Sequence, residues 1–156
     1  MNKLIFITAF TLTVASLISV ARASEISRNL PSYVIIHSEA HPNTARALNA
    51  VHHFEIKVPK SGLLSLSIAI PKGISIRDGI EVKDRSGQNI DAEVSMNDEK
   101  ATLVFSQPVS NQKMLTINLK NVKTRGLDNI WNYRIYGTIV GMNQEIPLGT
   151  ARIQTY

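Results

Sequence analysis

Residues 101–120 read ATLVFSQPVSNQKMLTINLK. On both sides of the middle of this stretch, apolar side chains recur at every second position: Leu103, Phe105, Leu115, Ile117 and Leu119. A period of two is typical of a β-strand that buries one face. The intervening residues 107–112 are rich in turn formers. The stretch therefore predicts two strands in a hairpin-like arrangement at the centre of a hydrophobic core.

The same alternation continues on both sides of this stretch. Further strands are predicted at residues 33–37, 54–58, 64–70, 74–76, 80–82, 90–94, 131–140 and 146–156. Turn signals separate them at intervals of about 8–12 residues, which is typical of a β-sandwich or barrel. A parallel sheet would need helical crossovers, and no segment after residue 52 has a helical pattern. We therefore predict an all-β, antiparallel, immunoglobulin-like β-sandwich of about eight strands.

Two local features qualify this pattern. Asn43 or Thr44 could cap a short helix over residues 44–49. Pro147 lacks a backbone N–H, so the segment 146–148 is expected at a sheet edge or at a bulge.

The first 23 residues have the pattern of a secretory signal peptide, which also predicts export to the periplasm or the cell exterior. Lys3 precedes a mostly apolar run over residues 4–20, and Ala21-Arg22-Ala23 is a small-x-small cleavage site. The alternative is an uncleaved anchor, but the run of 17 residues contains several Thr and Ser and is barely long enough to span a bilayer. We predict cleavage and a single domain over residues 24–156 with no stable membrane span.

Composition excludes several classes of function. The chain has no cysteine, which excludes disulfides, thiol catalysis and Cys-based metal sites. Of 17 basic residues, cleavage removes Lys3 and Arg22, so 15 face 12 acidic residues, a net charge of +3. A nucleic-acid binder would need a basic stripe with interleaved aromatics, which is absent. The small basic cluster of Lys120, Lys123 and Arg125 is either a solvated loop or a site for an anionic envelope polymer.

Several segments carry a resemblance to a known family: HHFEIKVPKSGL, IAIPKGI, VKDRSGQNI, VFSQPV and EIPLGTARIQTY. Together, in this order, they resemble a family of small exported cyanobacterial proteins known as domain of unknown function 2808. The resemblance covers residues 52–156 and implies export, but no activity and no site residues. LVFSQPV is also similar to a stretch of bacterial immunoglobulin-like modules, of which one branch is the periplasmic copper-binding CopC-type fold. The amino-terminal histidine of that branch is missing, because the predicted mature chain begins at Ser24.

Four histidines lie close together in the sequence: His37, His41, His52 and His53. Imidazole is the commonest protein ligand of copper and zinc. Pro42 disfavours helical geometry at His41, so a helical pair with His37 is not expected. His52 and His53 are adjacent and face opposite sides of a strand, so at most one of them could join a site. The candidate ligands are His37, His41 and His53 (or His52), and the alternative is solvated or locally hydrogen-bonded histidines.

No catalytic motif is present. The sequence lacks a Gly-x-Ser-x-Gly elbow, a His-Glu-x-x-His zinc motif and a phosphate-cradling glycine loop. Its carboxylates, such as Asp78, Asp84 and Asp98, fall mostly at predicted turns. We therefore expect no enzyme and no cofactor.

The aromatic strand WNYRIYGTIV gives the best candidate for a partner-binding surface. If Trp131 and its alternate neighbours point inward, Arg134 and Tyr136 point outward, and the last strand sets Arg152 and Tyr156 on the same outer face. Tyr and Arg are enriched where surfaces bind partners. The alternative is a half-exposed tyrosine that only covers its neighbours.

The sequence thus predicts an exported, non-catalytic module that binds an envelope protein or polymer through its surface. The alternative is a periplasmic copper- or zinc-binding protein that uses the histidines before residue 54.

Overall fold

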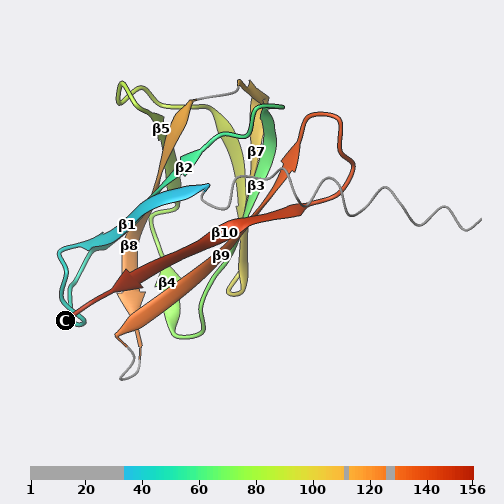
Figure 1. Ribbon diagram of the computed structural model, residues 1–156. Coiled ribbons are helices and arrows are strands. Elements are labelled where there is room, and N and C mark those ends of the chain that lie inside the picture. Colours follow the sequence, from blue (N-terminus) through green and yellow to red (C-terminus); the bar gives the residue numbers. More distant parts are fainter. Residues whose placement is uncertain (1–33, 111–112, 126–128) are drawn as a thin grey trace, which may run out of the picture. The chain divides into compact units, whose positions relative to one another are not determined.

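Ten β-strands make up the part of the chain that the computed structural model describes, residues 34–110, 113–125 and 129–156. In chain order they are β1 (Ile35–His41), β2 (Ala50–Lys57), β3 (Leu63–Ala69), β4 (Ile74–Ile76), β5 (Ile80–Asp84), β6 (Ala92–Met96), β7 (Lys100–Val109), β8 (Met114–Thr124), β9 (Ile130–Ile139) and β10 (Ile146–Gln154). They form two antiparallel sheets, and no helix occurs in these residues (Figure 1). The predicted all-β, antiparallel sandwich is confirmed. The predicted signal peptide, residues 1–23, lies outside the described residues.

The two sheets divide the strands in a way that local alternation does not reveal. One sheet has the order β1-β2-β8-β4, with β5 also paired to β8, and the other has the order β10-β9-β3-β7-β6. Strands β7 and β8 therefore belong to different sheets, and the predicted hairpin-like arrangement of residues 101–120 is wrong. Strands β7 and β8 have the buried faces that their alternation predicted, but a period of two does not specify which strand is the hydrogen-bonded partner.

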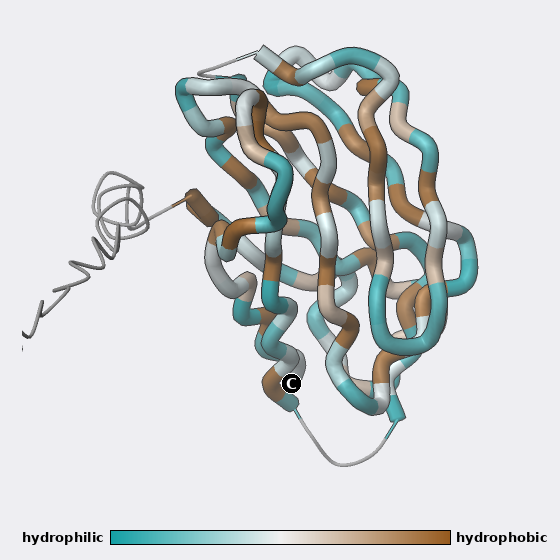
Figure 2. Tube along the Cα trace, turned by 90° about the vertical axis from the view of Figure 1, so that its right-hand side faces the viewer, coloured by the Kyte–Doolittle hydropathy of each residue, from teal (hydrophilic) through white to brown (hydrophobic). Residues whose placement is uncertain are grey.

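The core lies between the sheets and is filled by every second residue. Phe54, Ile117, Trp131, Tyr133 and Ile135 are fully or almost fully buried. Figure 2 shows the corresponding alternation of hydrophobic and hydrophilic residues along the strands. The inward orientation predicted for Trp131 is confirmed. Such burial contributes roughly 1.5–3 kcal/mol per large apolar side chain, before chain entropy opposes it.

The first strand differs most from prediction. It begins at Ile35 and continues to His41, four residues beyond the predicted end at residue 37. The predicted helix over residues 44–49 is wrong, because this segment consists of turns before β2 starts at Ala50. Strand β1 pairs with β2 from Ile35 to His41. Pairing with a neighbouring strand therefore outweighs the weak local preference of the polar residues after His37.

Strands β3 and β10 each contain a bulge that shifts their register. In β3 the register shifts between Leu63 and Ser65, so Leu63 is buried and Leu64, the predicted core residue, is only half-buried. In β10 the register shifts between Pro147 and Gly149, and β10 is the outermost strand of its sheet. The predicted edge or bulge position of Pro147 is therefore confirmed.

The predicted loop at residues 84–87 is a turn, but the strands on either side of it separate. The amide of Ile90 donates to the carbonyl of Val82, so the chain folds back as predicted. Beyond it, β6 joins β7 in one sheet while β5 pairs with β8 in the other.

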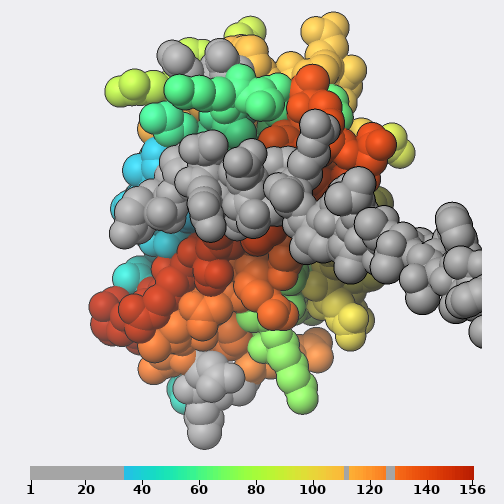
Figure 3. Space-filling view, turned by 45° about the vertical axis from the view of Figure 1, so that its right-hand side comes forward, coloured from blue at the N-terminus to red at the C-terminus, as the bar shows by residue number. Residues whose placement is uncertain are grey.

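Strand β1 lies beside β10, although the two strands belong to different sheets. The hydroxyl of Ser38 donates a hydrogen bond of 2.8 Å to the carbonyl oxygen of Arg152. In Figure 3 the blue surface of β1 adjoins the orange-to-red surface of β9 and β10. One edge of the sandwich is therefore closed, and the histidine-bearing strand has a fixed position against the rest of the domain.

Candidate functional site

Strands β1 and β2 bring three histidines and one glutamate together on one face. The period of two along β1 puts His37, Glu39 and His41 on the same side, away from buried Ala40. Glu39 is directly opposite His53 in the antiparallel register. On β2 the same alternation turns His52 into the core and His53 outward, so the prediction that these neighbours face opposite sides is confirmed.

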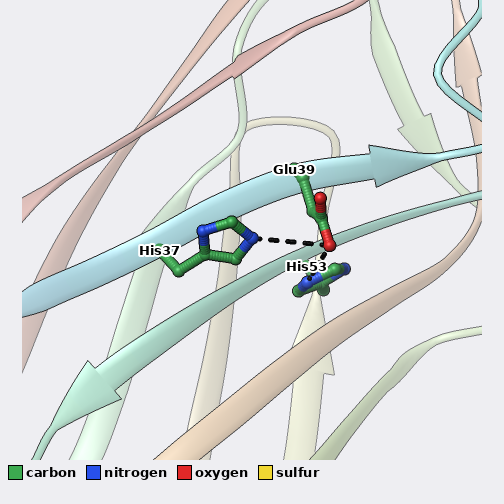
Figure 4. A group of neighbouring side chains, drawn as sticks. All are labelled: His37, Glu39 and His53. Atoms are coloured by element: carbon green, nitrogen blue, oxygen red, sulfur yellow. Dashed lines mark ion pairs between the residues drawn. The ribbon is translucent and has the colours of Figure 1, made fainter.

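The three outward histidines converge on a single carboxylate oxygen. Glu39 Oε1 lies 2.7 Å from His41 Nε2, 3.1 Å from His53 Nε2 and 3.4 Å from His37 Nε2. Figure 4 shows the side chains of His37 and Glu39 from β1 and of His53 from β2 directed toward one another. The rings of His41 and His53 are stacked, with centroids 5.3 Å apart and an angle of 13° between planes.

These distances match those between ligands of one metal ion. Ligand atoms at about 2 Å from a tetrahedral zinc ion lie roughly 3.3 Å from one another. One donor atom each from His37, Glu39 and His53 lies within 4.8 Å of the other two. His41, at 2.7 Å from Glu39, is instead at hydrogen-bonding distance. The geometry therefore assigns His37, Glu39 and His53 as potential ligands and His41 as the residue that orients the carboxylate.

The electrostatics of the cluster favour a charged carboxylate and a neutral imidazole. The hydrogen bond with His41, together with His37 and the other nearby imidazoles, lowers the pKa of Glu39. Burial lowers the pKa of His53, although the negative charge of Glu39 opposes this effect. A metal ion needs an ionised carboxylate and an unprotonated ring nitrogen, so both shifts favour metal binding.

One further potential ligand, Glu39, lies among the predicted histidines. Sequence reasoning named His37, His41 and His53 but missed Glu39. The signal was present in HSEAH, residues 37–41, where His, Glu and His occupy alternate positions. The polar composition of this segment does not predict a strand, so its alternation is not recognisable as one face from the sequence alone. His37 and His53 are close, with ring centroids 5.7 Å apart.

The predicted partner-binding residues lie on the outer faces of β9 and β10 and at the end of the chain. Arg134 pairs in register with Thr150, and Tyr136 pairs with Pro147. Arg134 and Arg152 are exposed, whereas Tyr136 is half-buried. The backbone of Tyr156 bonds with Asn43 and Ala45, beyond the end of β10.

The four predicted residues thus comprise two neighbouring cations, Arg134 on β9 and Arg152 on β10, and two separated tyrosines. Asn132, the register partner of Arg152, is two residues from Arg134 on the same strand, so the two arginines are diagonal neighbours. Tyr136 and Tyr156 are placed toward opposite ends of β10.

A polar network covers part of this outer face. Ser67 of β3, the register partner of Tyr136, donates its hydroxyl hydrogen to Glu145. Lys100 of β7 forms an ion pair of 3.2 Å with the same carboxylate. The hydrogen bond from Ser67 and the charge of Lys100 lower the pKa of Glu145. Glu145 therefore anchors the β9–β10 turn to two strands of the sheet.

The basic cluster predicted at residues 120–125 does not act as a unit. Lys120 forms an ion pair of 3.2 Å with Glu81 on neighbouring β5. Arg125 instead lies at the end of β8, where it lines a separate cavity with Lys72 and Arg134. Lys120 and Arg125 therefore have different surroundings.

In the described part of the chain, no helix is long and apolar enough to cross a membrane.

Comparison with known proteins shows likeness at the level of the fold. No family model matches the sequence, and no curated protein matches it either. The resemblance to domain of unknown function 2808 therefore stays a prediction.

Among solved structures, the chain is similar to the N-terminal domain of the Streptococcus gordonii adhesin Sgo0707, with a TM-score of 0.53 and 10% identity over 76% of this chain. It spans only 32% of the length of that chain. It is also similar to the collagen-binding domain of a Staphylococcus aureus adhesin, with a TM-score of 0.50 and 10% identity over 80% of this chain and 99% of that one. A protein of Nocardia farcinica with an immunoglobulin-like fold matches with a TM-score of 0.46 and 11% identity, over 72% of this chain and 81% of that one. The chain therefore shares with the two adhesin domains the fold alone, an antiparallel β-sandwich.

Proposed function

We propose that this chain is an exported, non-catalytic binding module of the cell envelope or periplasm, and that it binds a zinc or copper ion through His37, Glu39 and His53. The observation that carries the metal site is the approach of His37 Nε2 and His53 Nε2 to the same Glu39 oxygen at 3.4 and 3.1 Å. Export is supported by the signal peptide pattern of residues 1–23. The fold, shared with two adhesin domains, agrees with a role in binding.

The type of donor atom selects the class of metal. Two imidazole nitrogens and one carboxylate oxygen suit Zn²⁺ and Cu²⁺, whereas Ca²⁺ and Mg²⁺ prefer oxygen ligands alone. His37, Glu39 and His41 are well exposed, with 51%, 40% and 63% of their side-chain surfaces accessible, and His53 is 16% accessible. The solvent side of the ion is therefore open to a fourth ligand, which can be water or, after rotation of its ring, His41.

Calorimetric titration of the purified chain with Zn²⁺ and Cu²⁺ tests the site. We expect one ion per chain, and at least tenfold weaker binding for H37N, H53N and E39Q. A matched control is E93Q, because Glu93 is an exposed carboxylate on β6 of the other sheet. Electron paramagnetic resonance of the Cu²⁺ complex should show coupling to two imidazole nitrogens in the wild type and to one in H53N.

Two outcomes would contradict the metal site. One is the absence of binding at micromolar metal. The other is equal affinity of H53N and the wild type, which would mean that the metal binds elsewhere. H41N separates the two roles open to His41. A loss of metal affinity as large as that of H53N would identify His41 as a ligand, and a smaller loss would identify it as the residue that orients Glu39.

A second candidate function is recognition of an envelope protein or polymer by the outer face of β9 and β10. It is favoured by the exposure of two neighbouring cations, Arg134 and Arg152, beside Tyr136. Pull-down from envelope extracts should recover a partner with the wild type and less of it with the double variant Y136A/R152A. Equal recovery by both would exclude this face, without bearing on the metal site.

A further inference from the structure

A cationic cavity lies at one end of the sheet that contains β1, β2, β5 and β8. Its volume is about 550 Å³, and three basic side chains, Lys57, Arg85 and Lys113, line it together with Asp84. Ile36 and Met114 add apolar surface to its wall. None of these residues belongs to the histidine–glutamate cluster. The cavity is therefore a site distinct from the proposed metal centre.

Backbone pairing holds the two lysines in place. Lys57 is the last residue of β2 and pairs in register with Met114, the first residue of β8. The amide of Val58 donates to the carbonyl oxygen of Lys113 at 2.9 Å. The two lysines therefore come from adjacent strand ends whose relative position is fixed by hydrogen bonds, although their sequence positions are far apart.

The third cation is presented by a rigid turn. Asp84 Oδ1 accepts hydrogen bonds from the amides of Ser86 and Gln88, at 2.9 and 3.1 Å, and from the hydroxyl of Ser86. The backbone adds a bond from the amide of Gly87 to the carbonyl of Asp84 at 2.9 Å. These bonds fix the turn that carries Arg85.

The balance of charge in the cavity is positive. Within the described residues, Lys57, Arg85 and Lys113 form no ion pair with a carboxylate. The one carboxylate in the wall, Asp84, directs an oxygen at three donors of its own turn. Three basic groups around one carboxylate that is already hydrogen-bonded attract an anion. An arginine adds two parallel N–H donors that match the geometry of an oxyanion.

We propose that this cavity binds a phosphate or sulfate group, with Arg85 as the directional donor and Lys57 and Lys113 as point charges. A second hollow of about 390 Å³ shares Asp84, Arg85 and Met114 with it and continues over Glu55 and Thr116. This continuation leaves room for a ligand larger than one ion. The anionic group can therefore belong to a polymer or to a free ion.

Two probes distinguish these sources: inorganic phosphate and long-chain inorganic polyphosphate, each titrated into the full chain and followed by calorimetry and by amide chemical shifts. We expect shifts at Lys57, Arg85 and Lys113, and weaker binding at higher salt. The variants R85Q and K57Q/K113Q should bind at least tenfold more weakly. Binding of both probes identifies a site for a single anion, and binding of polyphosphate alone identifies a site for a polymer.

The control matched to R85Q is K123Q, which also removes one positive charge, from β8. Lys123 lies nine residues beyond Met114 along β8, which is about 30 Å at 3.3 Å per residue. It should bind within twofold of the wild type. A loss of affinity in K123Q as large as that in R85Q would show that only net charge matters and would overturn the proposal, as would the failure of both probes to bind the wild type. The cavity variants should retain wild-type affinity for zinc, since they leave the histidine cluster intact.

Discussion

His52 Nδ1 lies 2.8 Å from the hydroxyl oxygen of Tyr133 inside the core, and this hydrogen bond joins β2 of one sheet to β9 of the other. The rings meet edge to face, with centroids 5.9 Å apart. Both side chains are fully buried, and among the described residues His52 Nε2 has no hydrogen-bond partner. Whichever tautomer the ring adopts, one polar atom stays unsatisfied, so this pair couples the sheets at an energetic cost.

The first prediction is that the two partners are coupled in stability. Y133F removes the hydroxyl and leaves both ring nitrogens of His52 without a partner, which should destabilise the fold by about 1–3 kcal/mol. H52L leaves the hydroxyl of Tyr133 unpaired and should have a comparable cost. The double variant H52L/Y133F replaces both polar groups by apolar ones, so its free energy of unfolding should exceed the value that adding the two single effects predicts. Denaturant unfolding of the four proteins measures the coupling, and strict additivity would show that the hydrogen bond contributes nothing.

The second prediction is a loss of stability at acid pH that depends on His52. Burial lowers the pKa of His52 from 6.5 to about 4. The unfolded chain then binds a proton at higher pH than the folded chain does. Stability should therefore be full above pH 6.5 and fall as the pH drops from 6.5 to 4, by on the order of 3 kcal/mol, since one pKa unit is worth about 1.4 kcal/mol.

Unfolding midpoints of wild type and H52L between pH 7.5 and 4 isolate this contribution. The difference in stability between the two proteins should shrink as the pH falls, because the leucine variant has no proton to bind at this position. A constant difference over that range would mean that protonation of His52 does not cause the loss of stability at acid pH.

Alternation along the strands allowed most of the buried residues to be predicted. Ile117 and Trp131 face inward as expected, because a strand that buries one face must place apolar residues at every second position. Pairing could not be derived in the same way. The two strands of residues 101–120 look like neighbours in the sequence, yet β7 and β8 lie in opposite sheets. The choice of partner depends on contacts between distant segments, which one sequence does not encode locally.

The candidate metal site was predicted only in part, for a related reason. Its histidines were recognisable by residue type, but Glu39 lies in a segment whose polar composition gives a weak strand signal. The strand forms there because β2 provides a partner along its full length. Likewise, Leu63 replaces Leu64 in the core because a bulge in β3 shifts its register against β9 by one residue. Both differences arise from the geometry of neighbouring strands.

The third prediction concerns Gly73, which connects β3 to β4. Its φ of +92° is a conformation that side chains other than glycine rarely adopt, and an added Cβ would lie 2.6 Å from the carbonyl oxygen of Arg125. The carbonyl of Gly73 also accepts a hydrogen bond of 2.7 Å from the amide of Arg125. G73A should therefore destabilise the domain by about 1–3 kcal/mol.

Gly87 provides the comparison for this prediction. Its φ is similar, at +83°, but an added Cβ would meet no atom of the described residues within 4 Å. G87A should thus show the cost of the backbone conformation alone. Chemical denaturation measures the free energy of unfolding of both variants, and the difference between their losses is the contribution of the steric contact with Arg125. Equal losses would mean that this contact relaxes freely.

The fourth prediction is that metal affinity decreases as the pH is lowered. The cause is protonation of the imidazoles and not of the carboxylate. A ring nitrogen binds a metal only when it is unprotonated, and an imidazole ordinarily titrates near pH 6.5. The hydrogen bond with His41 lowers the pKa of Glu39, so this carboxylate stays ionised throughout the range from pH 7.5 to 5. Burial lowers the pKa of His53, which keeps that ring available at a more acid pH than a free imidazole. The apparent zinc affinity should therefore drop by about one to two logarithmic units per pH unit at the acid end of this range.

Competition titration with a zinc-sensitive dye at intervals of half a pH unit measures this profile. E39Q removes the charge and preserves the shape of the side chain, so it should lower the affinity at every pH and leave the slope unchanged. H53N removes one titrating ligand and should make the slope shallower by about one proton per zinc. An affinity that is independent of pH between 7.5 and 5 would mean that the imidazoles do not bind the metal, because a nitrogen ligand cannot avoid competition with protons over the range in which it titrates.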